Sequence, residues 1–139
     1  MQPTRYSQRS LAEKLDLKPG MRVCILNAPD GYLQALGAIV AQVELTENLT
    51  PAHHCDLIHL FLREDSTALE RVSHVKPALK TSGALWISWP KKSSGMATDL
   101  NEKLIREIGL GLGLVDVKVC AVDETWSGLK FVYRLKDRV

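Results

Sequence analysis

The chain has 139 residues, of which 18 are Lys or Arg and 16 are Asp or Glu, so its formal net charge is +2. This length suits a single domain over residues 1–139 and leaves too little chain for a second core. The hydrophobic share of 45% is too high for a disordered chain, and the nearly balanced charge gives no support to nucleic-acid binding.

The apolar segments and the cysteines indicate a cytoplasmic protein. No apolar run approaches the roughly 20 residues that a membrane-spanning helix needs, and residues 1–6 lack the apolar core of a secretion signal. Cys24, Cys55 and Cys120 are an odd number of cysteines in or beside apolar segments, which is typical of reduced, buried thiols.

Hydrophobic periodicity and turn residues divide the chain into strands and helices. Residues 1–9 are expected to be loosely ordered. The expected strands are 23–26, 42–45, 56–62, 84–90, 115–122 and 129–136. The expected helices follow Ser10, span 32–40, begin near Thr67 and begin after Asp99.

Caps and apolar stripes define these helices. Ser10 and Glu13 match a capping box, and Asp99 with Glu102 three residues later predicts a second N-cap. Pro77 is expected to kink the third helix. The predicted apolar stripes are Leu33, Leu36 and Val40; Leu69, Val72, Val75 and Leu79; and Leu100, Leu104, Ile105 and Ile108.

Strands that alternate with helices imply a mostly parallel sheet covered on both faces. The last two strands alternate apolar and polar residues around a turn at 123–128, which predicts an antiparallel β-hairpin. The expected fold is a Rossmann-like three-layer α/β sandwich. Only a short segment separates the second strand from the third, although parallel strands normally need a connection of a dozen or more residues.

This order of elements, over about residues 20–136, resembles class I methyltransferases, whose sheet ends in such a hairpin, with one strand and its helix missing. Three stretches further resemble a family of small bacterial proteins known only as a domain of unknown function. They are Asn27 to Tyr32, Trp89 to Gly95, and Val115 to Phe131. The resemblance implies a trimmed methyltransferase-like fold and brings no established activity.

Ligands of open α/β sheets bind beyond the carboxyl ends of the parallel strands. If the segment 115–122 runs parallel to the central strands, its turn joins the other loops at that rim. The predicted ligand-binding residues are Asn27, Asp30, Gly31, Lys91, Lys92, Ser93, Ser94, Asp123, Glu124 and Trp126.

The loop after the first strand departs from a cofactor fingerprint. Such a fingerprint needs several glycines, whereas this loop has Gly31 alone, and Pro29 removes a backbone donor. Glu44 or Glu47 could meet a ribose. The main interpretation is a structural turn in which Asp30 caps the next helix, so no cofactor is expected; S-adenosylmethionine is the alternative.

The loop Lys91-Lys92-Ser93-Ser94-Gly95 offers ammonium and hydroxyl groups to a small anion, or it is simply a solvated basic loop. Trp126 either stacks on a ligand or partner, or folds back towards Trp86 or Trp89.

Three further patterns favour structural roles. Asp123 and Glu124 could form an acid/base pair, but adjacent carboxylates in a turn usually point apart. His59 lies in the middle of a strand without a triad pattern, which indicates a core or rim histidine instead of a catalytic one. His53-His54-Cys55 alternate in direction along an extended chain and do not predict a metal site.

Two hypotheses follow from these features. The first is a non-catalytic module on a degenerate methyltransferase-like scaffold that binds a small anion or a protein partner, with no membrane or nucleic-acid partner. The alternative is a minimal S-adenosylmethionine-dependent methyltransferase, which accounts for the order of elements.

Overall fold

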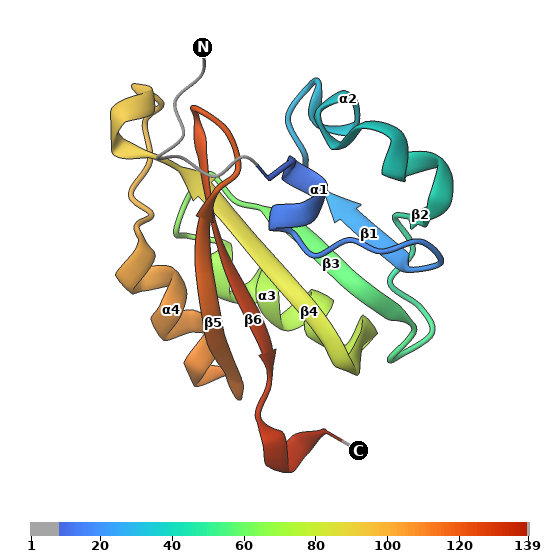
Figure 1. Cartoon of the computed structure of the whole chain (residues 1–139). Coiled ribbons are helices and arrows are strands. Elements are labelled where there is room, and N and C mark those ends of the chain that lie inside the picture. The colour runs from blue at the N-terminus through green and yellow to red at the C-terminus, as the bar shows by residue number, and fades with distance from the viewer. Residues whose placement is uncertain (1–8, 139) are drawn as a thin grey trace.

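A computed structural model describes residues 9–138 (Figure 1), so the expectation for residues 1–9 falls outside the described part except for Arg9. The strands are β1 (Arg22–Leu26), β2 (Glu44–Thr46), β3 (Cys55–Phe61), β4 (Leu79–Pro90), β5 (Leu114–Ala121) and β6 (Trp126–Tyr133). The α-helices are α1 (Leu11–Lys14), α2 (Tyr32–Leu36), α3 (Ala68–Val75) and α4 (Glu102–Gly111). Short 3-10 helices are η1 (Gly37–Gln42), η2 (Lys76–Ala78), η3 (Lys92–Ser94) and η4 (Leu135–Asp137).

The six strands form one sheet in the order β2-β1-β3-β4-β6-β5. The strands β2, β1, β3 and β4 are parallel, whereas β6 pairs antiparallel with both β4 and β5. It follows that β5 runs in the same direction as β4. The predicted Rossmann-like sandwich with a terminal antiparallel hairpin is confirmed. The short link is also confirmed, because residues 47–54 alone join β2 to β3 across β1.

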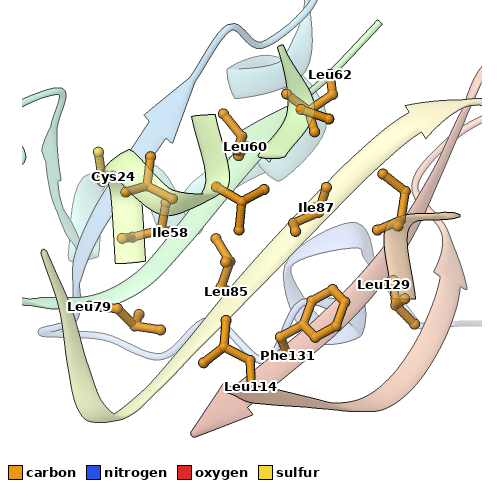
Figure 2. Close-up of a cluster of buried hydrophobic side chains, with 14 of the residues drawn as sticks. Cys24, Ile58, Leu60, Leu62, Leu79, Leu85, Ile87, Leu114, Leu129 and Phe131 are labelled. Atoms are coloured by element: carbon orange, nitrogen blue, oxygen red, sulfur yellow. The ribbon is translucent and has the colours of Figure 1, made fainter. Parts of the chain in front are cut away.

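Helices cover both faces of the sheet (Figure 1), and each face carries its own hydrophobic cluster. On one face, α3 and α4 pack on a cluster that includes Leu85, Ile87 and Phe131, whose side chains converge in Figure 2. On the other face, α1 and α2 cover a cluster that includes Tyr32 and Trp126. Burial on both faces explains why the central strands read as continuous apolar runs.

The predicted helix over 32–40 is wrong in its length and its stripe. α2 ends at Leu36 because Gly37 has a φ of 78°, a left-handed conformation that breaks the helix. Leu33, a member of the predicted stripe, is 47% exposed. The predicted cap at Asp30 is also wrong, since the N-cap residue is Gly31, with a φ of 84°.

The boundaries of α3 and α4 also differ from the prediction. α3 ends at Val75, and Pro77 lies in η2, so Leu79 begins β4 instead of extending the helix stripe, and Leu69 is 56% exposed. The N-cap of α4 is Asn101, whose side chain accepts a hydrogen bond from the Leu104 amide.

Asp99, the predicted cap of α4, instead accepts a hydrogen bond from the amide of Asp65, in the loop after β3. The capping box of Ser10 and Glu13 is confirmed, with both hydrogen bonds present. Among the helices of residues 9–138, none is long and apolar enough to cross a membrane.

Candidate functional site

Four loops meet at the carboxyl rim of the parallel strands. The Asn27 side chain donates a hydrogen bond to the Phe61 carbonyl, at 3.1 Å, which joins the loop after β1 to the end of β3. The Lys91 amide donates to the Thr125 carbonyl, at 2.7 Å, which joins the loop after β4 to the hairpin turn. The direction of β5 thus brings the hairpin turn to the same rim as the loops after β1, β3 and β4, as the sequence predicts.

Trp126 closes the half of this rim that lies over β4 and β6. Its side chain is 2% exposed and belongs to the same cluster as Trp86. Phe61 meets its ring edge-on, at a centroid distance of 5.2 Å, and the Arg63 guanidinium lies 5.1 Å from its centroid. The structure therefore has the inward-folded arrangement, in which the ring is not available to stack on a ligand.

The polar residues of this closed half make hydrogen bonds within their own loops. Asp123 Oδ1 accepts from the amides of Thr125 and Trp126, both at 2.8 Å, which shapes the hairpin turn. Glu124 is exposed. The Ser94 hydroxyl donates to the Lys91 carbonyl, at 2.6 Å.

Lys92 and Ser93 are exposed in η3, next to this hydrogen-bonded loop. Neither the two lysines nor Asp123 lines the two cavities considered below. The binding of an anion by residues 91–94 stays a prediction.

The other half of the rim, over β1 and β2, contains an open cavity of about 790 Å³. Pockets for small molecules and cofactors occupy roughly 300–1,000 Å³. The lining residues come from the end of β1 and its loop, from α2, and from the end of β2. They are Ile25, Leu26, Asn27, Ala28, Pro29, Gly31, Tyr32, Leu33, Gln34, Leu45, Thr46 and Glu47.

Two residues of the β1 loop have left-handed backbone conformations. Asn27 has a φ of 63° and Gly31 a φ of 84°. Asn is one of the few non-glycine residues that visit this region readily, so Asn27 does what a glycine does at a sharp turn. A Cβ built on Gly31 would meet no atom within 4 Å, which leaves the loop backbone open to a ligand. A count of glycines did not detect the left-handed residue at position 27. The sequence signal that could have found it is an Asn directly after a buried strand.

Glu47 lies opposite this loop. In the β1–β2 register Thr46 pairs with Cys24, so Glu47 extends beyond the strand towards the rim, and it follows Asn27 by 20 residues. Glu44 does not line the cavity, because it lies at the start of β2 and forms an ion pair with Arg22 at 2.9 Å. Of the two acids considered from the sequence, Glu47 is the one at the cavity.

A buried hydrogen-bonded chain supports the cavity from inside the sheet. Both His59 and Ser88 are 0% exposed. His59 Nδ1 lies 2.5 Å from the Tyr32 hydroxyl, and Nε2 lies 2.7 Å from the Ser88 hydroxyl. Burial lowers the pKa of His59 to about 3 and raises the pKa of Tyr32. The predicted core histidine is confirmed, and this neutral chain fixes Tyr32, the first residue of α2.

The cysteines have the environment of structural thiols. Cys24 and Cys55 are 0% exposed, and burial raises the pKa of Cys24 to about 12. Burial also raises the pKa of Cys55 and of the half-buried Cys120, so all three stay protonated at neutral pH and are poor nucleophiles. Within the described residues, no group of three or more His, Cys, Asp or Glu side chains could hold a metal ion.

Comparison with solved structures finds the same arrangement in methyltransferases. A putative type 11 methyltransferase from Sulfolobus solfataricus has a TM-score of 0.61 and 16% identity over 91% of both chains. A methyltransferase dependent on S-adenosylmethionine from Aquifex aeolicus has a TM-score of 0.59 and 17% identity over 87% of this chain and 86% of its own.

A third structure, 1,6-didemethyltoxoflavin-N1-methyltransferase from Burkholderia thailandensis with bound S-adenosylhomocysteine, has a TM-score of 0.61 and 11% identity, over 87% of this chain and 73% of its own. No protein-family model and no curated protein match the sequence. The chain therefore has the fold of the class I methyltransferases that depend on S-adenosylmethionine.

Proposed function

We propose that the protein binds S-adenosylmethionine, and its product S-adenosylhomocysteine, in the cavity over β1 and β2, and acts as a minimal methyltransferase. The observation that carries this proposal is the placement of Glu47 opposite a loop with two left-handed residues, Asn27 and Gly31. An acidic residue about 20 positions after the first loop is the usual partner of a ribose in this class of fold.

The chemistry of the cavity fits this ligand better than a phosphate-bearing one. Of the described residues that line the cavity, none is Lys or Arg, and Glu47 is the one charged side chain. Phosphates are normally met by cations or by several backbone amides. S-adenosylmethionine has no phosphate and carries a positively charged sulfonium, so a site without cations suits it.

The residues of the cavity divide into those that would meet polar and those that would meet apolar parts of the ligand. The Glu47 carboxylate would accept hydrogen bonds from the ribose hydroxyls, and the backbone of residues 27–31 would approach the amino-acid end. Leu26 and Leu45 supply apolar surface. When bound, S-adenosylmethionine supplies an activated methyl group.

The non-catalytic interpretation rested on the missing glycines of the β1 loop. The left-handed Asn27 weakens that argument, because it provides the backbone geometry without a glycine. Binding of a small anion by Lys91 and Lys92 is compatible with a methyltransferase-like scaffold and is tested separately with phosphate.

Isothermal titration calorimetry of the purified protein with S-adenosylhomocysteine tests the proposal. We expect saturable binding that Glu47→Gln weakens by at least about tenfold, since a charge-assisted hydrogen bond contributes roughly 1.5–3 kcal/mol. Glu44→Gln is the matched control, because Glu44 lies at the start of β2, three residues before Glu47 and outside the cavity, and it should leave the affinity unchanged.

Absence of binding in the unmodified protein, or equal effects of the two substitutions, would contradict the proposed function. Binding of phosphate but not of S-adenosylhomocysteine, lost in a Lys91→Ala and Lys92→Ala double variant, would instead support the anion-binding module.

A further inference from the structure

A second cavity, which the proposed function does not use, lies on the opposite face of the sheet. It has a volume of about 650 Å³ and is lined by Leu26, Asn27, Leu49, Leu60, Thr67, Glu70, Arg71, His74 and Val75. Leu26, Leu49 and Leu60 belong to the cluster under α3 and α4, whereas Tyr32 and Ile25 of the first cavity belong to the cluster under α1 and α2. The two cavities share Leu26 and Asn27, at the rim.

The connection between β2 and β3 explains why this cavity exists. A parallel crossover usually carries a helix that covers the sheet, but residues 47–54 contain none. Leu49 alone of that segment packs on the cluster, so the sheet beside α3 is incompletely covered. The result is a groove with an apolar floor of Leu26, Leu49, Leu60 and Val75.

One wall of the groove is a polar face of α3. Thr67, Glu70, Arg71 and His74 are spaced at i, i+3, i+4 and i+7, which places them on one side of a helix. A helix that packs on a sheet normally turns its polar side to bulk water. Here that side borders an apolar floor, so charged and apolar groups face the same space.

The two opposite charges on this wall have no ion-pair partner among residues 9–138. Arg71 Nε donates to the Thr67 hydroxyl, at 3.3 Å, which orients the guanidinium. Glu70 and Arg71 both line the groove. One positive and one negative group above an apolar surface are complementary to a ligand with a carboxylate, an ammonium and an apolar body.

We propose that this groove is a second ligand site, which binds an apolar or aromatic α-amino acid as its zwitterion. Arg71 takes the carboxylate, Glu70 takes the ammonium, and the side chain lies on the partly buried Leu26 and Leu49. The site is distinct from the first cavity, with which it shares Leu26 and Asn27 at the rim, and a ligand in each would lie on opposite faces of the sheet.

Chemical-shift mapping on the ¹⁵N-labelled chain tests this proposal with L-phenylalanine, 3-phenylpropionate and 2-phenylethylamine as probes. We expect saturable shifts of the amides of Leu49, Leu60 and Glu70 with L-phenylalanine. The two single-charge probes should bind at least about fivefold more weakly, because each leaves one charged group without its partner.

Arg71→Ala and Glu70→Gln should each weaken L-phenylalanine binding by a similar factor. Lys103→Ala and Glu107→Gln, exposed positions on α4 outside the groove, are the matched controls and should leave it unchanged. Equal binding of all three probes, no effect of Arg71→Ala, or no binding at all would overturn the proposal.

A repeat with saturating S-adenosylhomocysteine separates the two sites. We expect L-phenylalanine to bind with the same affinity in its presence. Competition between the two would show that the groove holds one end of the first cavity's ligand, and would overturn a separate site. Binding of L-phenylalanine without any binding of S-adenosylhomocysteine would contradict the proposed function and leave the amino-acid site standing.

Discussion

The two halves of the rim are built differently although the same sheet supports both. Over β4 and β6, the buried Trp126 ring closes the rim, and Asp123 and Ser94 hold their loops through local hydrogen bonds. Over β1 and β2, the loop from Asn27 to Gly31 leaves a cavity of about 790 Å³. The open cavity of the rim thus lies over β1 and β2, away from Trp126 and the two lysines.

The difference shows how chemistry-bearing residues can mislead. Trp126 and Lys91 are conspicuous in the sequence. In the structure, however, the Trp126 ring lies in the core, and the Lys91 amide donates a hydrogen bond to the hairpin turn. A ligand site needs open volume with a few converging polar groups. In this chain, the cavity is lined by the left-handed Asn27 and by one carboxylate, Glu47.

The largest expected effect is in the closed half. Trp126→Ala should lower the free energy of unfolding by about 3–5 kcal/mol, because it empties a buried site beside Phe61. Leu33→Ala is the control in the open half, where the side chain is 47% exposed, and it should cost less than about 1 kcal/mol. Urea unfolding measures both losses of unfolding free energy. Equal losses would contradict the distinction between a closed half and an open half.

The second effect concerns His59, which links the two halves through Tyr32 and Ser88. Burial lowers its pKa from 6.5 to about 3, so between these values the unfolded chain binds a proton that the folded chain does not. Stability should therefore fall as the pH drops below about 6.5, by on the order of 2 kcal/mol between pH 6 and pH 4.

Urea unfolding from pH 7 to pH 4 checks this in the protein and in His59→Gln. The pKa values of Asp16, Asp56 and Asp116 are lowered in the fold, so carboxylates add to the loss of stability at the acid end. The difference in slope between the two proteins isolates His59, and identical slopes would argue against a neutral buried imidazole.

The third effect tests the backbone of the open half. Gly31→Ala should destabilise the protein by roughly 1–2 kcal/mol, because a side chain at a φ of 84° is strained. The substitution should also weaken the binding of S-adenosylhomocysteine. Gly111→Ala, in α4 where an added Cβ meets nothing within 4 Å, should instead stabilise by up to about 1 kcal/mol. Thermal unfolding measures both changes in stability. If both substitutions stabilise or both destabilise the protein, Gly31 is not required for its left-handed conformation.

The smallest effect is expected from the lysines of the closed half. The double variant Lys91→Ala and Lys92→Ala should change the free energy of unfolding by less than about 0.5 kcal/mol and leave the affinity for S-adenosylhomocysteine within about twofold. The Lys91 amide keeps its hydrogen bond to Thr125 in this variant. A large loss of affinity would place the ligand across both halves of the rim.

The sequence predicted the sheet better than it predicted the helices and the site. Continuous apolar runs located β1 and β3, and alternation located the hairpin, because side-chain direction in strands is fixed by period two. The end of α2 at Gly37 and the early start of β4 at Leu79 depend on local backbone conformation, which periodicity does not resolve.

The sequence predicted where the candidate site lies better than it predicted which residues line it. Strand direction placed the loops at one rim, but whether Trp126 points inward depends on packing against Phe61, from a strand far away in the sequence. Asn27 has a left-handed φ of 63°, and a count of glycines does not detect a left-handed residue of another type.

Chemical-shift mapping of bound S-adenosylhomocysteine tests most directly where the rim accepts a ligand. We predict that the largest amide shifts fall on residues 27–31 and 45–47, while residues 91–95 and 123–126 change little. Shifts concentrated around Lys92 and Trp126 instead, or none in either half, would contradict the claim that the cavity over β1 and β2 is the binding site.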